Sequence, residues 1–282
     1  MMSRCANIAI PLSAAIMFKC KAKNSVTQAK SSPNKLPDFD FKKYKKSQDG
    51  LQRERNENDC VVNGDVFCAG GKYADEQATD WKLSHDSLNK NDSLKVWNRK
   101  RLNGETEYRL YSNIENIYWQ DFLEVQLNCD YRKEWDSWVQ LLEPMQCEND
   151  KEGTIGEACV YKWVQKMPGA LLKSREYTYL REVFHFPEDR TVIIAARDVP
   201  GVDSENKTVK VENYQSVMVI KYAENDEKGF SYLLTYHDDV SKILPGWFQA
   251  WANGRGARSS HDKIISKCLE LEKRREQKLG FK

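Results

Sequence analysis

The sequence predicts an α+β fold, in which an antiparallel sheet carries helices at its beginning, middle and end. From residue 78 onward, runs rich in Val, Ile, Tyr and Thr alternate with loops of Pro, Gly, Asp and Asn, as strands and turns do. The dipeptide Asn103-Gly104 between two such runs is typical of a hairpin. Helical spacing of apolar residues is confined to Tyr118–Trp138 and to the C-terminal region, which favours an antiparallel sheet over repeated βαβ units.

The expected elements follow in chain order. The first strands are predicted at Trp81–Leu83, Leu94–Arg101 and Glu107–Ser112. Residues Tyr118–Trp138 then predict one broken helix or two consecutive helices. Further strands are predicted at Ala158–Val164, Arg175–Phe186, Thr191–Ala196, Thr208–Tyr222 and Phe230–Tyr236. The last elements are helical segments at Pro245–Ala252 and Lys263–Gln277, separated by Gly254 and Gly256.

The charge distribution divides the chain into three parts. Residues 1–50 carry ten Lys and Arg against three Asp and Glu, and there is no acidic residue up to Pro37. We therefore expect residues 1–37 to be a mitochondrial transit-like segment; a secretory signal is the alternative, but lysines stand where small residues should precede a cleavage site. Residues 38–77 are predicted to be a polar linker, largely disordered, and residues 78–277 the folded domain.

Composition excludes several classes of function. The remainder of the chain is slightly acidic, so no nucleic-acid partner is expected. The eight cysteines are scattered, with no C-x-x-C pair and no spacing that combines with histidine, so neither a zinc site nor a disulfide framework is predicted. No cofactor-binding motif is present, and no cofactor is expected.

The heptapeptide Asp130–Asp136 carries the most informative charged pair. A helix would place Arg132 and Asp136 one turn apart, next to Trp135. A guanidinium is a planar fork of donors that suits phosphate or carboxylate, and the aspartate can hold it in one orientation. The alternative is an ordinary ion pair on a solvated helix face, worth about 0.5 kcal/mol or less.

A catalytic reading depends on the few histidines. His237 precedes Asp238 and Asp239 at the end of a predicted strand, which superficially suggests a base and an orienting carboxylate. No nucleophile elbow, Cys/His signature or phosphate-binding loop accompanies them. We therefore predict no catalytic residue and no enzyme.

Three motifs resemble one known family. Besides Asp130–Asp136, they are Ser174-Arg175-Glu176-Tyr177-Thr178-Tyr179-Leu180-Arg181 and Gly229-Phe230-Ser231-Tyr232-Leu233-Leu234-Thr235-Tyr236. Together, over roughly residues 78–275, the chain resembles the START (StAR-related lipid transfer) domain, in particular its phosphatidylcholine-transfer branch and the member of that branch with a mitochondrial presequence. The resemblance implies a helix-grip fold, in which a curved antiparallel sheet encloses a lipid tunnel around a long C-terminal helix.

The same resemblance implies a head-group site. Arg132 would bind the lipid phosphate, with Asp136 beside it. The aromatic cage for choline would consist of Trp163, Tyr177 and Tyr214, because a quaternary ammonium is recognised by aromatic faces. An ordinary sheet aromatic is the alternative for each of these three residues taken singly.

Apolar stripes supply candidates for the tunnel lining. The candidates are Met218, Ile220, Tyr232, Leu234, Trp247 and Trp251. The same stripes would line any dry core, so this prediction depends on the resemblance. The chain departs from the family at Arg258–His261, where a Pro and apolar residues usually open the last helix, and we expect a looser or differently aimed start to that helix.

These observations predict a non-enzymatic protein that carries one phosphatidylcholine between membranes and delivers it to mitochondria. The expected partners are phosphatidylcholine or a related phospholipid and, transiently, a membrane; we expect a monomer. Residence in the mitochondrion, with the cytoplasm as a second location, follows from the N-terminal segment. The alternative is a lipid-sensing module, in which a bound phospholipid or ceramide alters a partner without bulk transfer.

Overall fold

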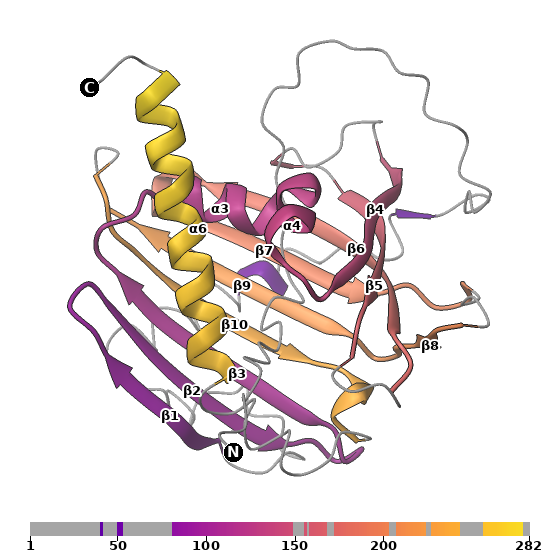
Figure 1. Ribbon diagram of the computed structural model, residues 1–282. Coiled ribbons are helices and arrows are strands. Elements are labelled where there is room, and N and C mark those ends of the chain that lie inside the picture. The colour runs from indigo at the N-terminus through magenta and orange to yellow at the C-terminus, as the bar shows by residue number, and fades with distance from the viewer. Residues whose placement is uncertain are drawn as a thin grey trace, which may run out of the picture.

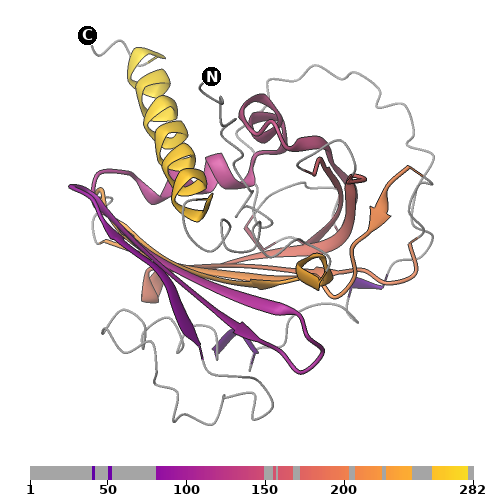
Figure 2. The same ribbon diagram turned by 60° about the horizontal axis from the view of Figure 1, so that its bottom comes forward.

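One curved sheet with helices on its concave side forms the body of the molecule (Figures 1 and 2). The computed structural model describes residues 40–41, 50–52, 81–148, 155–156, 158–167, 172–202, 207–223, 227–242 and 256–278. The strands are β1 (Lys82–Leu88), β2 (Asp92–Lys100), β3 (Thr106–Ile114), β4 (Val139–Cys147), β5 (Ala158–Gln165), β6 (Arg175–Phe186), β7 (Thr191–Asp198), β8 (Val209–Lys210), β9 (Gln215–Tyr222) and β10 (Phe230–His237). The helices are α3 (Trp119–Leu127), α4 (Cys129–Trp135) and α6 (Ala257–Lys278), with short 3₁₀ turns η1 (Pro187–Asp189) and η2 (Asp239–Lys242).

The sheet is antiparallel throughout its main path. Its strand order is β1-β2-β3-β10-β9-β7-β6-β5-β4, and only the short β8 pairs in parallel, with β6. The chain therefore reaches the middle of the sheet last, when β10 inserts between β3 and β9. The predicted α+β class with an antiparallel sheet is confirmed.

Local sequence explains the first hairpin and the helix pair. Gly104 adopts a φ of 82° in the turn between β2 and β3, a conformation that glycine reaches without strain. Further along the chain, Asn128 separates α3 from α4. Its backbone N–H donates to the carbonyl oxygen of Glu124, which caps the end of α3. Its side-chain oxygen accepts a hydrogen bond of 2.9 Å from the N–H of Tyr131, which caps the start of α4. The two-helix form of the prediction is confirmed.

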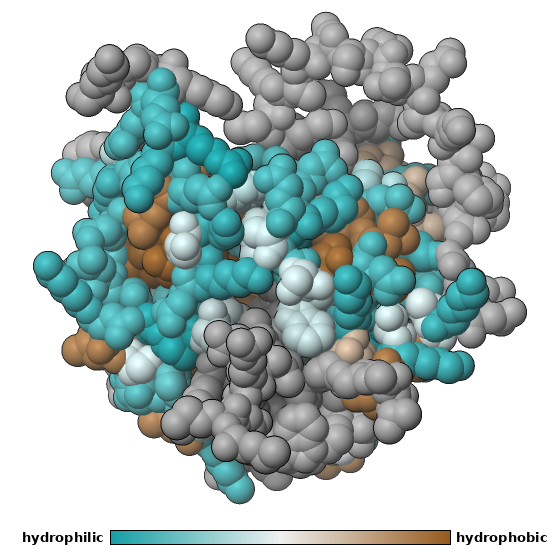
Figure 3. All heavy atoms as spheres, viewed as in Figure 1, coloured by the Kyte–Doolittle hydropathy of each residue, from teal (hydrophilic) through white to brown (hydrophobic). Residues whose placement is uncertain are grey.

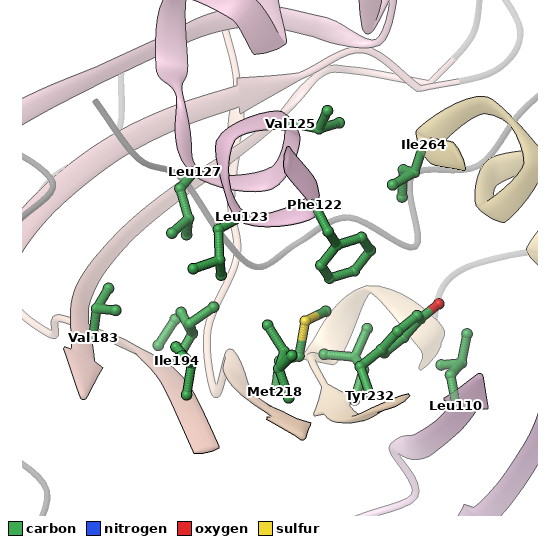
Figure 4. Packing of buried hydrophobic residues seen from close by; sticks show 14 of the residues in the cluster. Leu110, Phe122, Leu123, Val125, Leu127, Val183, Ile194, Met218, Tyr232 and Ile264 are labelled. Carbon is green, nitrogen blue, oxygen red and sulfur yellow. The ribbon is translucent and has the colours of Figure 1, made fainter. Parts of the chain in front are cut away.

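The main core lies between the concave face and the helices. Alternate residues of each strand point inward, so Leu110, Ile194, Met218 and Tyr232 meet side chains of α3 and α6 (Figure 4). The Phe122 ring of α3 lies 5.1 Å from that of Tyr232, measured between centroids. This end of the concave face is therefore packed by the protein's own helices.

The convex face carries a second apolar layer. Leu51 is 2% exposed and packs on outward-facing residues of β7 and β9, among them Ile193 and Val219. Phe41, also buried, packs on Val160 and Leu180 of β5 and β6. The short segments that contain Phe41 and Leu51 lie on the side of the sheet opposite α6, where the indigo pieces of the ribbon are drawn in Figure 2.

The helix α6 crosses the concave side and begins earlier than predicted. Its buried positions include Ala257, Ser260, His261, Ile264 and Cys268, a spacing of three to four residues that marks one helix face. The opposite face meets solvent with mostly hydrophilic residues, as Figure 3 shows. The expectation of a loose start at residues 258–261 is wrong, because Arg258 binds Asp92 of β2 at 2.6 Å and His261 is hydrogen-bonded to Ser112 of β3 at 2.8 Å.

Two features at the β4 edge were not predicted. Strand β4 was missed, since Pro144 and three polar residues interrupt any regular alternation in Val139–Cys147. A disulfide joins Cys147 to Cys159, which face each other across β4 and β5. No motif announces this pair, because its proximity is created by strand register rather than by sequence spacing.

Within the described part of the chain, none of the helices combines the length and the apolar character needed to cross a bilayer.

Candidate functional site

The helix α4 holds a buried ion pair at one end of the concave face. Arg132 donates from Nε to Asp136 Oδ2 at 2.7 Å, and its Nη2 lies 2.6 Å from the same oxygen. The side chains are 3% and 4% exposed, so the alternative of a solvated surface pair is excluded. Asp136 Oδ1 accepts from the Trp138 N–H at 3.1 Å, which fixes the carboxylate and, through it, the guanidinium.

Neighbouring aromatic rings complete the surroundings of Arg132. Its guanidinium carbon lies 4.9 Å from the centre of the Trp135 ring, within cation–π distance. The Nζ of Lys263, on α6, lies 5.5 Å from the same ring. Trp135 therefore lies within cation–π distance of a buried cation of α4 and a second cation of the C-terminal helix.

Three buried aromatic residues on the concave face form what we call the aromatic cluster: Trp163, Tyr177 and Tyr214. Trp163 and Tyr177 are directly opposite each other on β5 and β6, and their rings stack at 4.5 Å. Tyr177 meets Tyr214 edge to face at 5.4 Å. The pleat of neighbouring strands thus brings together three residues that are distant in sequence.

Polar atoms of this region lack partners within the described protein. Trp163 Nε1, Tyr214 OH and Ser216 Oγ are buried and make no hydrogen bond there. A buried donor or acceptor without a partner costs about 1–3 kcal/mol, and a polar ligand at the aromatic cluster would offset that cost for these atoms.

The electrostatics of the aromatic cluster follow from its burial. Burial raises the pKa of Tyr177 and of Tyr214 well above the ordinary tyrosine value. Ser216 is close enough to Tyr214 to oppose part of that rise in pKa, although the two oxygens make no hydrogen bond of normal geometry. The positive charge of Arg132 opposes the rise in the pKa of Tyr214 as well. Both tyrosines are therefore neutral at physiological pH, and Tyr214 lies within the field of Arg132.

The environment of His237, the histidine considered for catalysis, differs from that expected of a general base. His237 Nδ1 lies 3.1 Å from Arg101 Nη1 and 3.8 Å from Glu107 Oε1. Burial, together with the charge of Arg101, lowers the pKa of His237 to about 4. Elsewhere in the described residues, no three His, Cys, Asp or Glu side chains are grouped so that they could hold a metal ion.

Comparisons with known proteins agree with this fold. No family model matches the chain. Among curated proteins, the chain is 28% identical over 208 residues to "StAR-related lipid transfer protein 7, mitochondrial" from Mus musculus, which covers 72% of this chain and 53% of that protein. It is 26% identical over 175 residues to the human "Phosphatidylcholine transfer protein", covering 61% of this chain and 77% of that one.

Solved structures show the same architecture. Human STARD10 superposes with a TM-score of 0.52 at 19% identity, over 71% of this chain and 77% of that one. Human StAR-related lipid transfer protein 5 superposes with a TM-score of 0.54 at 16% identity, over 78% and 99%. The chain has the START fold. Its sequence is similar to that of proteins of the phosphatidylcholine-transfer branch, and it spans about half the length of the mitochondrial relatives that it matches.

The START fold brings together most of the residues singled out in the sequence. Arg132, Asp136 and the aromatic cluster are all buried at one end of the concave face. The candidates for the lining, Met218, Ile220, Tyr232 and Leu234, are buried further along the same face, in strands β9 and β10. Trp247 and Trp251 lie outside the described residues.

A second buried guanidinium was overlooked. Arg181 follows Tyr177 and Tyr179 on the inward face of β6, and it is 2% exposed. Its guanidinium lies over the Tyr161 ring at 3.9 Å and donates to the Tyr161 hydroxyl, while Nη1 is buried without a partner in the described residues. The signal was present, because alternation along a strand puts every second residue on one face.

Proposed function

We propose that this START domain binds one phosphatidylcholine against the concave face and carries it between membranes without chemical change. One observation supports the proposal: the guanidinium of Arg132 is fixed and buried, and its charge acts on Tyr214 of the buried aromatic cluster. A phosphate needs a cationic partner when it leaves water, and a quaternary ammonium needs aromatic faces. The two halves of a phosphocholine head group therefore find their preferred partners at one place.

In this proposal, each site residue has a separate task. Arg132 binds the phosphate and Asp136 holds the guanidinium in place. Trp163, Tyr177 and Tyr214 surround the choline, with each face worth about 0.5 to 2 kcal/mol. Met218, Ile220, Tyr232, Leu234, Trp247 and Trp251 would line the path of the acyl chains.

The acyl chains determine how much apolar surface the protein must bury. Two chains contain about 30 methylenes, and at ~0.8 kcal/mol for each buried methylene their transfer from water is worth on the order of 25 kcal/mol. A protein that holds such a ligand must admit and release it by opening. We propose that α6 moves for this purpose, together with the loop at Val199-Pro200-Gly201, in which Gly201 has a φ of 82°.

A transfer assay tests the proposal directly. Catalytic amounts of the full chain should move many labelled phosphatidylcholine molecules per protein from donor to acceptor vesicles. A lipid sensor would bind at most its own amount of lipid, so a plateau at one lipid per chain would contradict transfer.

Variants of Arg132 test the head-group assignment in the same assay. Loss of a charge-assisted contact worth about 1.5–3 kcal/mol should lower lipid extraction about tenfold or more. Because removal of Arg132 alone leaves the Asp136 charge buried and unpaired, Arg132→Gln should be combined with Asp136→Asn. Arg109→Ala removes a guanidinium that bonds Thr235 on β10, away from the site, and should leave extraction unchanged. Full extraction by the doubly substituted variant would refute the role of Arg132.

We further propose that mitochondria are the destination. The basic residues 1–37 and the mitochondrial relatives support this proposal. A fluorescent reporter fused to residues 1–37 should enter mitochondria, and a diffuse cytosolic signal would contradict the address.

A further inference from the structure

We propose that Asp238 supplies the counter-charge for the quaternary ammonium of a lipid bound at the aromatic cluster, and that it makes the site select zwitterionic over anionic head groups. This inference rests on the proposed function, because it concerns the same site. It adds an anionic end to a site whose cationic end is Arg132.

The position of Asp238 follows from the sheet. In the antiparallel pairing of β10 with β9, His237 is opposite Gln215, so the next residue, Asp238, comes opposite Tyr214. Side chains alternate along a strand, which puts Asp238 on the inward face with Tyr236. The carboxylate is buried, with the residue 7% exposed.

A direct contact joins Asp238 to the aromatic cluster. The Tyr177 hydroxyl donates to Asp238 Oδ2 at 3.2 Å. Tyr177 is the central ring of the cluster, stacked on Trp163 and in edge contact with Tyr214. Donation to a carboxylate polarises the phenol, so the ring face that a cation would meet becomes more electron-rich.

The charge of Asp238 acts on the whole group of rings. Burial raises the pKa of Tyr236 well above its ordinary value and that of Tyr108 to about 12, and in both cases the negative charge of Asp238 raises it further. The same charge raises the pKa of Tyr177 and Tyr214. At Tyr214 its effect on the pKa opposes that of Arg132, so the charges of a buried anion and a buried cation both act on this residue.

This arrangement matches the charge pattern of a zwitterion. A phosphate at Arg132 and an ammonium at the aromatic cluster would each have an opposite charge nearby, in a region where water screens little. A head group with a phosphate but no cation would instead bring an anion toward Asp238 without compensation. Repulsion of this kind contributes to specificity as much as attraction does.

The test compares two lipids with the same acyl chains. The full chain is incubated with mixed vesicles of phosphatidylcholine and phosphatidylglycerol, re-isolated, and its bound lipids are quantified by mass spectrometry. Asp238→Asn removes the charge, and its amide oxygen can still accept from the Tyr177 hydroxyl. We expect the preference for phosphatidylcholine over phosphatidylglycerol to fall about tenfold or more, and Asp238→Glu to retain most of it.

Asp239→Asn is the matched control, because it makes the same charge change one residue further along. Asp239 Oδ1 accepts from the Glu212 N–H at 3.2 Å, an acceptor role that asparagine can also fill. Its lipid preference should equal that of the wild type. An unchanged preference in Asp238→Asn, or an equal loss in Asp239→Asn, would overturn the inference.

A second pair of variants covers a folding failure of Asp238→Asn. Tyr177→Phe removes the hydroxyl that donates to the carboxylate, so the combined Tyr177→Phe, Asp238→Asn variant does not leave this hydroxyl without its charged acceptor. The charge effect is then the difference in lipid preference between the combined variant and Tyr177→Phe alone. Equal lipid preferences in these two variants would overturn the inference.

The outcomes also separate this inference from the proposed function. If the wild type took up neither lipid, the proposed function would fail and this inference with it. Uptake of phosphatidylcholine with an unchanged preference in Asp238→Asn would refute only the counter-charge.

Discussion

At the scale of single residues, the interior of this START fold contains charges that hold one another in place. Arg132 is fixed by one oxygen of Asp136, whose other oxygen is fixed by the backbone. Burial of an ion pair is weak evidence for stability, because desolvation offsets the attraction. The retention of such a pair on a concave, aromatic face therefore favours a ligand role.

His261 connects the C-terminal helix to the sheet and predicts a pH-dependent stability. Its ring is hydrogen-bonded to Ser112 and lies 6.2 Å from the Tyr232 ring, between Arg258, Asp92 and Asp262. Burial and the charge of Arg258 lower its pKa to about 4, against 6.5 in the unfolded chain. The unfolded state therefore binds more protons between these values, and the free energy of unfolding should fall as pH falls from about 6.5 to about 4, by on the order of 3 kcal/mol.

Urea unfolding at several pH values checks this sign. His261→Asn can keep a hydrogen bond to Ser112 but does not titrate, so its free energy of unfolding should fall less than that of the wild type over the same interval. His237, whose pKa is also about 4, contributes equally to both proteins and cancels in the difference. Parallel curves for the two proteins would show that His261 is not held neutral in the folded state.

At the scale of elements, both faces of the sheet are covered, and the convex cover comes from upstream of the main domain. Phe41 and Leu51 fall within the range for which the sequence predicted a linker. Both lie in stretches rich in charged and polar residues, where no sustained apolar periodicity marks them. Their burial against β5, β6, β7 and β9 makes residues 41 and 51 part of the folded unit.

Removal of these contacts should destabilise the domain. We expect Phe41→Ala and Leu51→Ala each to lower the free energy of unfolding by about 2 to 4 kcal/mol, because each empties a buried apolar site. Leu102→Ala, at a position that is 72% exposed, is the control and should change the free energy of unfolding by about 0.5 kcal/mol or less. Chemical denaturation of the full chain measures all three, and wild-type stability of both buried-site variants would contradict the packing.

Elements whose signal is local were predicted well. The predicted bounds of β6, Arg175–Phe186, are those observed, because this stretch is rich in β-branched and aromatic residues and is followed by Pro187. Strand β4 was missed because Pro144 and its polar residues hide the alternation. The first turn of α6 was missed because Arg258 is paired with the distant Asp92, and such pairing cannot be seen along the chain.

At the scale of the whole molecule, the sheet order explains how distant motifs meet. Trp163 and Tyr177 lie on β5 and β6, whereas Tyr214 directly precedes β9 and Asp238 directly follows β10. The sheet order brings these four residues, which are distant in sequence, to the same region. The resemblance to a family identified the first three as a group. The sequence suggested for Asp238 only the role of an orienting carboxylate beside His237, because its contact with Tyr177 depends on the order of the strands in the sheet.

The central claim is that the concave face binds a single zwitterionic phospholipid through Arg132. Native mass spectrometry of the full chain, re-isolated after incubation with phosphatidylcholine vesicles, tests it most directly. The account predicts one phosphatidylcholine per chain in the wild type and little or none in the combined Arg132→Gln, Asp136→Asn variant. A folded wild type without bound lipid, or equal occupancy in both proteins, would contradict it.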